Sequence, residues 1–220
     1  MDNFVYKQID WSKVTTGDVI LHYSSGDLIA EVEIIVERAE ANRLGIPKNY
    51  RLSTHIAIPL EFTSDYTLTK NIGFLWFKRE IRLTLAAGKY VFEEQIKGVE
   101  ENPISKYYND ETVEIRRRKI PFTLEQRLVF QEAVLKAWHD SYSYGWLAFF
   151  TQPAHTILDK DLTTKVIQGA KICSEYFACA VNDACLSNLD KEDFPDPANT
   201  NPLEIQINEN WERNTEVQPA

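Results

Sequence analysis

The chain has 220 residues, 44% of them hydrophobic and 12% aromatic, which is enough apolar material for one domain with a buried core. Its formal net charge of −9 argues against nucleic acid as a partner, because binding to a phosphate backbone depends on clustered lysine and arginine. The basic run at residues 116–119 alternates with apolar residues nearby, which is typical of the solvated face of a strand.

The sequence also lacks the signals of a membrane or secreted protein. No apolar stretch approaches the ~20 residues of a membrane-spanning helix, and the first residues have neither the basic start nor the long apolar run of a signal peptide. The three cysteines have C-x5-C-x5-C spacing, which fits neither a disulfide framework nor a zinc knuckle. We therefore expect a cytoplasmic protein with reduced thiols, no metal and no organic cofactor. The sequence gives no indication of oligomeric state.

The first half of the chain reads as short strands with one helix between them. Residues 19–23 predict an apolar strand. Residues 28–44 have charged and apolar residues at helical spacing and predict a helix, although their middle part would also suit a strand. Four later runs have the β-branched and aromatic content of strands: residues 52–59, 72–77, 90–94 and 112–120. Residues 52–120 together predict a sheet or small barrel with hairpin connections and a turn at residues 100–103.

Helices dominate the second half. A capping box and an apolar stripe predict a helix over residues 123–140. A second amphipathic helix begins near Cys173 and ends between residues 182 and 188. Residues 190–220 are expected to be a loop and tail, with one short element at residues 203–211.

Cys173 lies in the first turn of its predicted helix, on the same face as Phe177 and Ala180, and this face must be buried. The unpaired N–H groups and the positive dipole end of a helix stabilise a thiolate at such a position. Cys179 and Cys185 are expected to project away from this apolar stripe. A cysteine on the inner face of a helix is also often a plain buried hydrophobe. A nucleophile therefore needs a base and an orienting group from elsewhere in the chain.

Four histidines are candidates for that base. His139 lies at a helix end and His155 in a loop, where neither position fixes the imidazole. His55 lies in a predicted strand, which would hold its ring rigidly in the sheet that packs against the Cys173 helix. His22, at the end of the first strand, is the second choice. A strand histidine is also common as an ordinary packing residue.

Two carboxylates are candidates for the orienting group. Glu93 and Glu94 end the strand predicted at residues 90–94. Because alternate residues of a strand face opposite sides, only one of the two can point toward the histidine. Periodicity does not say which one, and both would also suit a solvated strand end.

Five short segments follow one another along the chain: Gly17-Asp18-Val19-Ile20-Leu21, Ser53-Thr54-His55-Ile56-Ala57-Ile58, Tyr90-Val91-Phe92-Glu93, Tyr142-Ser143-Tyr144-Gly145 and Ile172-Cys173-Ser174-Glu175. In this order they resemble the landmarks of the YiiX-like proteins, which are circularly permuted relatives of the NlpC-type, papain-like thiol hydrolases. The resemblance spans residues 16–185, and its specificity lies in the order and spacing of the segments. It implies an α+β, permuted papain-like fold in which an antiparallel sheet or small barrel packs against helices. It also implies one domain over residues 1–220, with residues 28–44 as a helical insertion.

The same resemblance implies a role for each candidate residue. Cys173 would be the nucleophile, His55 the base and Glu93 the group that orients the imidazole. Tyr142 or Tyr144 resembles the tyrosine ahead of the family's nucleophile, where a hydroxyl would assist oxyanion binding. The implied function is a thiol-dependent hydrolase that cleaves amide bonds in peptides, including cell-wall peptides.

Two other functions stay open. The permuted branch also resembles lipid acyltransferases that form thioester intermediates, so an ester or lipid acyl hydrolase or acyltransferase with an acylated small-molecule substrate is an alternative. From a different class, a catalytically silent binding or phage-structural module would keep the fold without the chemistry. The reactivity of the Cys173 thiol distinguishes the enzymes from the silent module.

Overall fold

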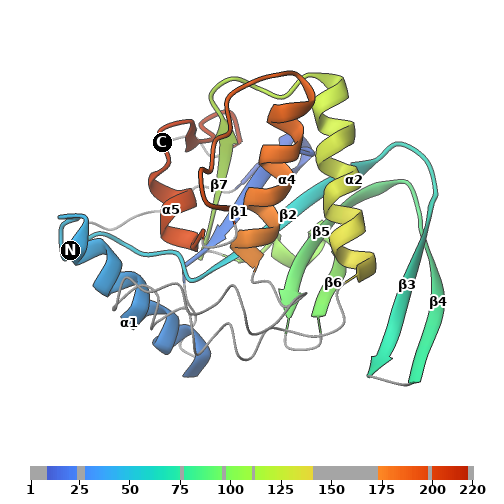
Figure 1. Cartoon of the computed structure of the whole chain (residues 1–220), viewed down its shortest axis with the longest axis horizontal. Helices are drawn as coiled ribbons and strands as arrows, with labels where there is room; N and C mark the ends of the chain where they lie inside the picture. The colour runs from blue at the N-terminus through green and yellow to red at the C-terminus, as the bar shows by residue number, and fades with distance from the viewer. Residues whose placement is uncertain are drawn as a thin grey trace.

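The computed structural model describes residues 9–23, 28–74, 77–95, 98–110, 112–140, 173–197 and 200–217. These residues form an α+β arrangement in which an antiparallel sheet packs against helices (Figure 1). The coarse fold class predicted from the sequence is therefore confirmed.

Six strands form the main sheet, and every neighbouring pair is antiparallel. In spatial order they are β6 (Gly98–Pro103), β5 (Gly88–Gln95), β2 (His55–Phe62), β1 (Asp18–His22), β7 (Val113–Arg118) and β8 (Trp211–Arg213). Within the described residues no ladder joins β6 to β8, so the sheet is open and does not close into a small barrel. A separate hairpin of β3 (Tyr66–Phe74) and β4 (Phe77–Leu85) projects from the sheet (Figure 1).

One strand prediction and one turn prediction were wrong in this region. The run at residues 72–77 is not one strand, because β3 ends at Phe74 and β4 begins at Phe77. Residues 100–103, expected as a turn, lie in strand β6. Their composition is that of a turn, but pairing with β5 supplies their backbone hydrogen bonds. Pro103 is tolerated because β6 is the edge strand of the sheet.

Helices α2 (Leu124–Asp140) and α4 (Cys173–Ser187) lie side by side across the sheet (Figure 1). The predicted capping box is present, since the Gln126 backbone N–H donates to Thr123 Oγ1 at 3.2 Å and the Thr123 N–H donates to Gln126 Oε1 at 3.0 Å. The helix expected over residues 28–44 is α1 (Leu28–Arg43). None of the described helices combines the length and hydropathy needed to cross a bilayer.

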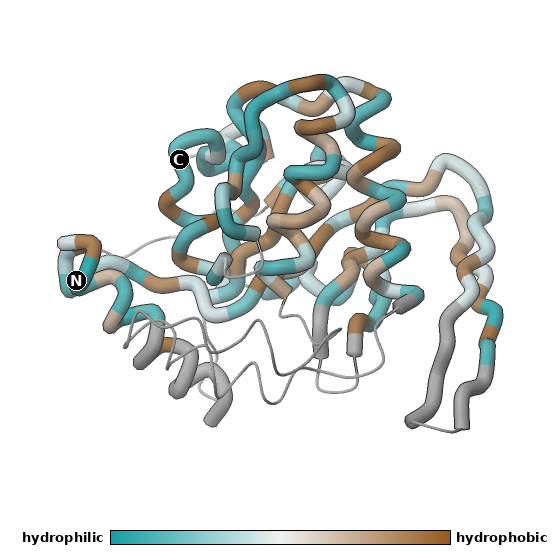
Figure 2. Tube along the Cα trace, viewed as in Figure 1, coloured by the Kyte–Doolittle hydropathy of each residue, from teal (hydrophilic) through white to brown (hydrophobic). Residues whose placement is uncertain are grey.

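The strands bury side chains on both faces, as their alternation requires. Ile56 and Ile58 of β2 belong to the core that also contains α2 and α4, whereas Ala57 belongs to a second core with Ile20 and Val91. In Figure 2 the hydrophobic colour is concentrated where the central strands pass beneath the two helices. This double burial makes the central strands a rigid support for any side chain at their ends.

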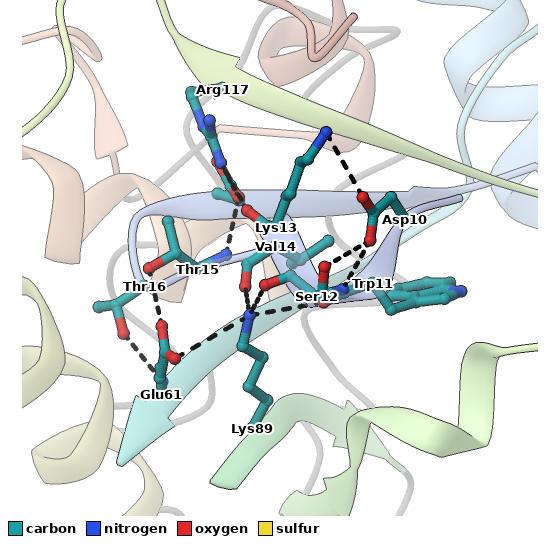
Figure 3. A network of polar contacts seen from close by, with 11 residues as sticks. Asp10, Trp11, Ser12, Lys13, Val14, Thr15, Thr16, Glu61, Lys89 and Arg117 are labelled. Carbon is teal, nitrogen blue, oxygen red and sulfur yellow. Dashed lines mark hydrogen bonds and ion pairs between the residues drawn. The ribbon is translucent and has the colours of Figure 1, made fainter. Parts of the chain in front are cut away.

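The segment that precedes β1 is tied to the sheet by two cations (Figure 3). Lys89 of β5 donates to the backbone carbonyl oxygens of Ser12 and Val14, the latter at 2.6 Å. Arg117 of β7 holds both carboxylate oxygens of Asp18, at 2.7 and 2.9 Å. Strand β1, which carries His22 at its far end, is therefore fixed at its beginning.

Residues 190–217 are more ordered than the loop and tail expected there. They contain α5 (Pro202–Ile207), which starts with a capping box of Asn201 and Glu204, and strand β8. Val217 is buried, and its carbonyl accepts a hydrogen bond of 2.9 Å from the Asp10 N–H. This part of the chain completes the sheet edge beside β7 and meets the segment before β1.

Candidate active site

Cys173 and His55 meet where helix α4 starts and strand β2 begins. Each is the first residue of its element, and α4 packs against β2. Cys173 Sγ lies 3.3 Å from His55 Nδ1, within hydrogen-bonding distance for sulfur. One turn further along α4, the fully buried Phe177 packs against two other rings. Its ring centroid lies 6.0 Å from that of Phe130 on α2 and 5.0 Å from that of Trp211 on β8. This packing fixes the helix end that presents the sulfur.

Glu93 of β5 lies on the other side of the imidazole. Its Oε2 is 3.5 Å from His55 Nε2, longer than an ordinary hydrogen bond but within ion-pair distance. Glu93 lies two residues after Val91 and shares its face of the sheet, so it is the glutamate directed at the histidine. The side chain of Glu94 lies outside the described residues. The structure thus brings together the three residues that the resemblance implied, in the order sulfur, imidazole, carboxylate.

Three further side chains hold the Glu93 carboxylate. Oε1 accepts hydrogen bonds from Lys106 Nζ and from Asn102 Nδ2, the latter at 3.1 Å, and Oε2 accepts one of 2.8 Å from the Tyr107 hydroxyl. Burial and the nearby Glu93 carboxylate raise the pKa of Tyr107, so its hydroxyl stays a donor. With four partners, a carboxylate that is only 3% exposed is both satisfied and oriented.

Sequence reasoning missed these three supporting residues. Asn102 lies on β6, and Lys106 and Tyr107 lie on the 3-10 helix η2 (Ile104–Tyr107) that follows it. The sequence signal there was that of a turn, and only the register of β6 on β5 brings the segment to Glu93. No local pattern marks them as neighbours of a histidine on another strand.

The charges around His55 favour its protonated form. Burial alone would lower the pKa of His55, but the facing Cys173 sulfur and the Glu93 carboxylate raise it well above its ordinary value. Burial would raise the pKa of Glu93, but the nearby His55 imidazole and the hydrogen bond from Lys106 lower it well below its ordinary value. The imidazolium form of His55, between the Cys173 sulfur and the Glu93 carboxylate, is therefore favoured.

A second histidine lies directly beside the first. His22 is the cross-strand partner of His55, and the ring centroids are 5.6 Å apart. Its ring also packs at 4.9 Å from that of Tyr107, and its Nδ1 lies 3.9 Å from Asp110 Oδ2. Burial and the proximity of His55 lower the pKa of His22 to about 4, although Asp110 and Glu93 act in the opposite direction. His22 is thus neutral at pH 7. The histidine that contacts Cys173 is His55.

The other predicted site residues are Tyr142 and Tyr144, and both lie outside the described residues, as does His155. His139 is in the last turn of α2. Among the described residues, no three histidine, cysteine, aspartate or glutamate side chains are grouped so that they would hold a metal ion.

No protein-family model matches the chain, and a search of curated proteins finds no relative. The chemistry of the site is therefore inferred from its own atoms. A thiol, an imidazole and a carboxylate lie next to one another in that order, which is the arrangement that an activated thiol would require.

Proposed function

We propose that this protein is a thiol-dependent hydrolase that cleaves amide bonds in peptides through Cys173, His55 and Glu93. The observation that carries the proposal is the 3.3 Å contact between Cys173 Sγ and His55 Nδ1, with Glu93 held against the opposite nitrogen of the ring. The order of the elements supports a permuted papain-like fold, because the strands with the histidine and the glutamate precede the cysteine helix in the chain.

The reaction begins with the thiolate and the imidazolium. The sulfur attacks the carbonyl carbon of the amide and a C–S bond forms. His55 then gives its proton to the amide nitrogen, the C–N bond breaks, and the amine leaves. Neutral His55 next takes a proton from water, whose oxygen attacks the thioester carbon. The C–S bond breaks, and the products are a carboxylic acid and the regenerated thiolate–imidazolium pair.

The start of α4 supplies a site for the negative charge that develops on the carbonyl oxygen. Cys173 is the first residue of α4 and lies at the positive end of the helix dipole. This end of the helix would stabilise an oxyanion beside the sulfur.

The Glu93 cluster favours an enzyme over a catalytically silent module. A binding module has no requirement for a buried carboxylate with four partners behind a histidine that itself contacts a thiol. An acyl ester would form the same thioester on Cys173, so an ester hydrolase or acyltransferase is the second candidate. The apolar side chains beside the sulfur, among them Phe92 of β5 and Val134 of α2, favour it.

Selective alkylation tests the activated thiol. Each cysteine is followed by mass spectrometry during reaction with iodoacetamide at pH 7. We expect Cys173 to react faster than the half-buried Cys179 and the buried Cys185, and we expect His55→Ala to slow Cys173 alone. Equal rates for Cys173 and Cys179, or a Cys173 rate that His55→Ala leaves unchanged, would contradict the proposed function.

A further inference from the structure

A cavity lined by arginines lies at the start of β1, at the end of the strand away from His22. The space inside it that water-sized molecules can reach is about 120 Å³. Its lining residues come from three places: residues 15–18, Arg117 and Arg118 of β7, and Pro121, Phe122 and Arg127 at the start of α2. Asp18 and His22 are the two ends of β1, roughly 13 Å apart at the usual rise of a strand, so this arginine cavity is separate from the candidate active site.

The three arginines of the cavity differ in their partners. Arg117 holds both carboxylate oxygens of Asp18, and Arg118 holds both of Asp193. Arg127 donates from Nε to a backbone carbonyl at 3.2 Å, and among the residues that the structure describes it has no ion pair. Burial raises the pKa of Asp18, and the hydrogen bonds from Arg117 and the charge of Arg127 oppose this, so Arg127 lies near a carboxylate that is already occupied. Within the described ranges, Arg127 is therefore the arginine of the cavity without an anionic partner of its own.

Thr16 offers a second donor at the same cavity. Its Oγ1 accepts a hydrogen bond of 2.9 Å from the Glu61 N–H (Figure 3), and its own O–H donates to no acceptor in the described part of the chain. The neighbouring Thr15 hydroxyl, by contrast, donates to Glu61 Oε2 at 3.1 Å. A guanidinium and a hydroxyl with hydrogens left to donate suit a ligand whose oxygens only accept, which is an ionised acid.

Phe122 gives the cavity a fixed apolar wall. The guanidinium carbon of Arg118 lies 5.2 Å from the centre of its ring. Gly17 approaches the ring closely, because a Cβ at this position would lie 3.0 Å from Phe122 Cδ2. The volume is somewhat below the roughly 150 Å³ of an apolar cavity that takes up benzene. The arginine cavity therefore has room for a charged group with one short chain or one small ring.

A carboxylate suits this cavity better than a phosphate. Its single negative charge balances the one arginine that lacks an ion pair, whereas the Asp18 carboxylate in the wall would repel the second charge of a phosphate. The terminal nitrogens of a guanidinium also bind both oxygens of a carboxylate in one plane. We propose that the arginine cavity binds the carboxylate of a small organic acid through Arg127. The proposal does not depend on the function proposed for Cys173.

Titration of the isotope-labelled protein with benzoate, followed by NMR, tests this site. The Gly17 amide and the Arg127 Nε–H signals should shift together and give one Kd. Benzamide has the same shape without the charge and should bind about 10- to 100-fold more weakly, because the charge-assisted hydrogen bonds are lost. Arg127→Gln should weaken benzoate binding by a similar factor. Lys136→Gln is the matched control, because it removes one positive charge at an exposed position further along α2, and it should bind benzoate as the wild type does.

Four results would overturn the proposal. Equal Kd values for benzoate and benzamide in the wild type would do so without any variant, and so would equal benzoate binding by the wild type and Arg127→Gln. Tighter binding of inorganic phosphate than of benzoate would contradict the choice of a carboxylate. Shifts at His55 without shifts at Gly17 would place the acid in the candidate active site, and the absence of shifts with benzoate and with the smaller propionate would exclude the cavity as a site. None of these results bears on the thiol, which is tested by the alkylation of Cys173.

Discussion

Helix α4 has a buried cysteine near each end, and the two thiols have opposite surroundings. Cys173 lies in the first turn, against an imidazole with a raised pKa. Cys185 lies in the last turns, where burial and the nearby Asp193 carboxylate raise its thiol pKa to about 11, although Arg118 acts against this. Residue type and burial are the same at the two positions. The place on the helix and the nearest charges therefore distinguish the proposed nucleophile from a core residue.

Both ends of α4 also lie near a buried carboxylate with several donors. Asp193 accepts two hydrogen bonds from Arg118, at 2.8 and 3.2 Å, and one of 3.1 Å from each of Asn210 and Trp211. All these donors are permanently protonated at neutral pH, so this cluster is structural. One partner of Glu93 is instead the His55 imidazole, which can exchange a proton. The two carboxylates are equally buried and satisfied, and the titrating partner is what suits Glu93 to the proposed catalytic role.

The largest expected difference between the two ends is in turnover. Cys173→Ala should lower kcat/KM by about 10⁴-fold, because the acyl-accepting atom is removed. Cys185→Ala, the matched control, should leave kcat/KM unchanged and lower the free energy of unfolding by about 1 kcal/mol through the small cavity it creates. Turnover of a peptide amide and urea unfolding of both variants measure this. Activity retained by Cys173→Ala would remove the distinction between the two thiols.

The next largest effect concerns stability at the C-terminal end of α4. Arg118→Met should lower the free energy of unfolding by about 3–5 kcal/mol, because it leaves the Asp193 carboxylate buried without a cation. Arg82→Met, at an exposed ion pair with Glu80, should cost less than about 1 kcal/mol. The folded fraction of Arg118→Met should keep its kcat/KM. Loss of activity in that folded fraction would mean that the two ends are coupled.

A third effect is the acid sensitivity of the N-terminal end. His22 has a native pKa of about 4, below the unfolded value of about 6.5, so its neutral form is favoured by folding. This contribution to stability is present above pH 6.5 and is lost as the pH falls toward 4, by roughly 3 kcal/mol. His22→Gln should remove that part of the pH dependence of urea unfolding. A variant with the same slope as the wild type would show that another group titrates there.

The smallest effect separates charge from shape at Glu93. Glu93→Gln keeps the size of the side chain but not the charge that favours imidazolium, so kcat/KM should fall by about 10- to 100-fold. The pKa of Glu93 is lowered in the native state, so its charge stabilises the fold above its unfolded pKa of about 4.3 and loses this effect as the pH falls further. The unfolding free energy of Glu93→Gln should therefore fall less below pH 4. Glu100→Gln, across the ladder on β6, serves as the control and should match the wild type in both measurements.

The three long helices were predicted from local sequence patterns. Cys173 followed from helical periodicity, His55 from its place in a strand, and the choice of Glu93 from the resemblance. Cys185 was expected to project away from the apolar stripe, but it is fully buried. The segment after α4 folds back over the helix, where Phe194 exchanges two backbone hydrogen bonds with the Asn182 side chain. Helical periodicity within α4 gives no information about a later loop that packs over the helix and buries Cys185.

The supporting shell of Glu93 was unpredictable for a related reason. Asn102, Lys106 and Tyr107 reach the carboxylate through strand pairing between β5 and β6, and nothing in their own segment indicates that pairing. The single-domain organisation expected over residues 1–220 stays a prediction. Local periodicity identifies elements, whereas the partners of a buried charge depend on contacts that form only in the complete sheet.

The hydrogen bond from the Asp10 N–H to the Val217 carbonyl brings these two segments together, so the order of the elements in the chain could be changed by circular permutation. A short glycine-rich linker from residue 217 to residue 9 would close the backbone into a ring, and the ring could be cut at residues 119–121, between β7 and α2. The re-ordered polypeptide would be synthesised with its cysteine helix ahead of the strands.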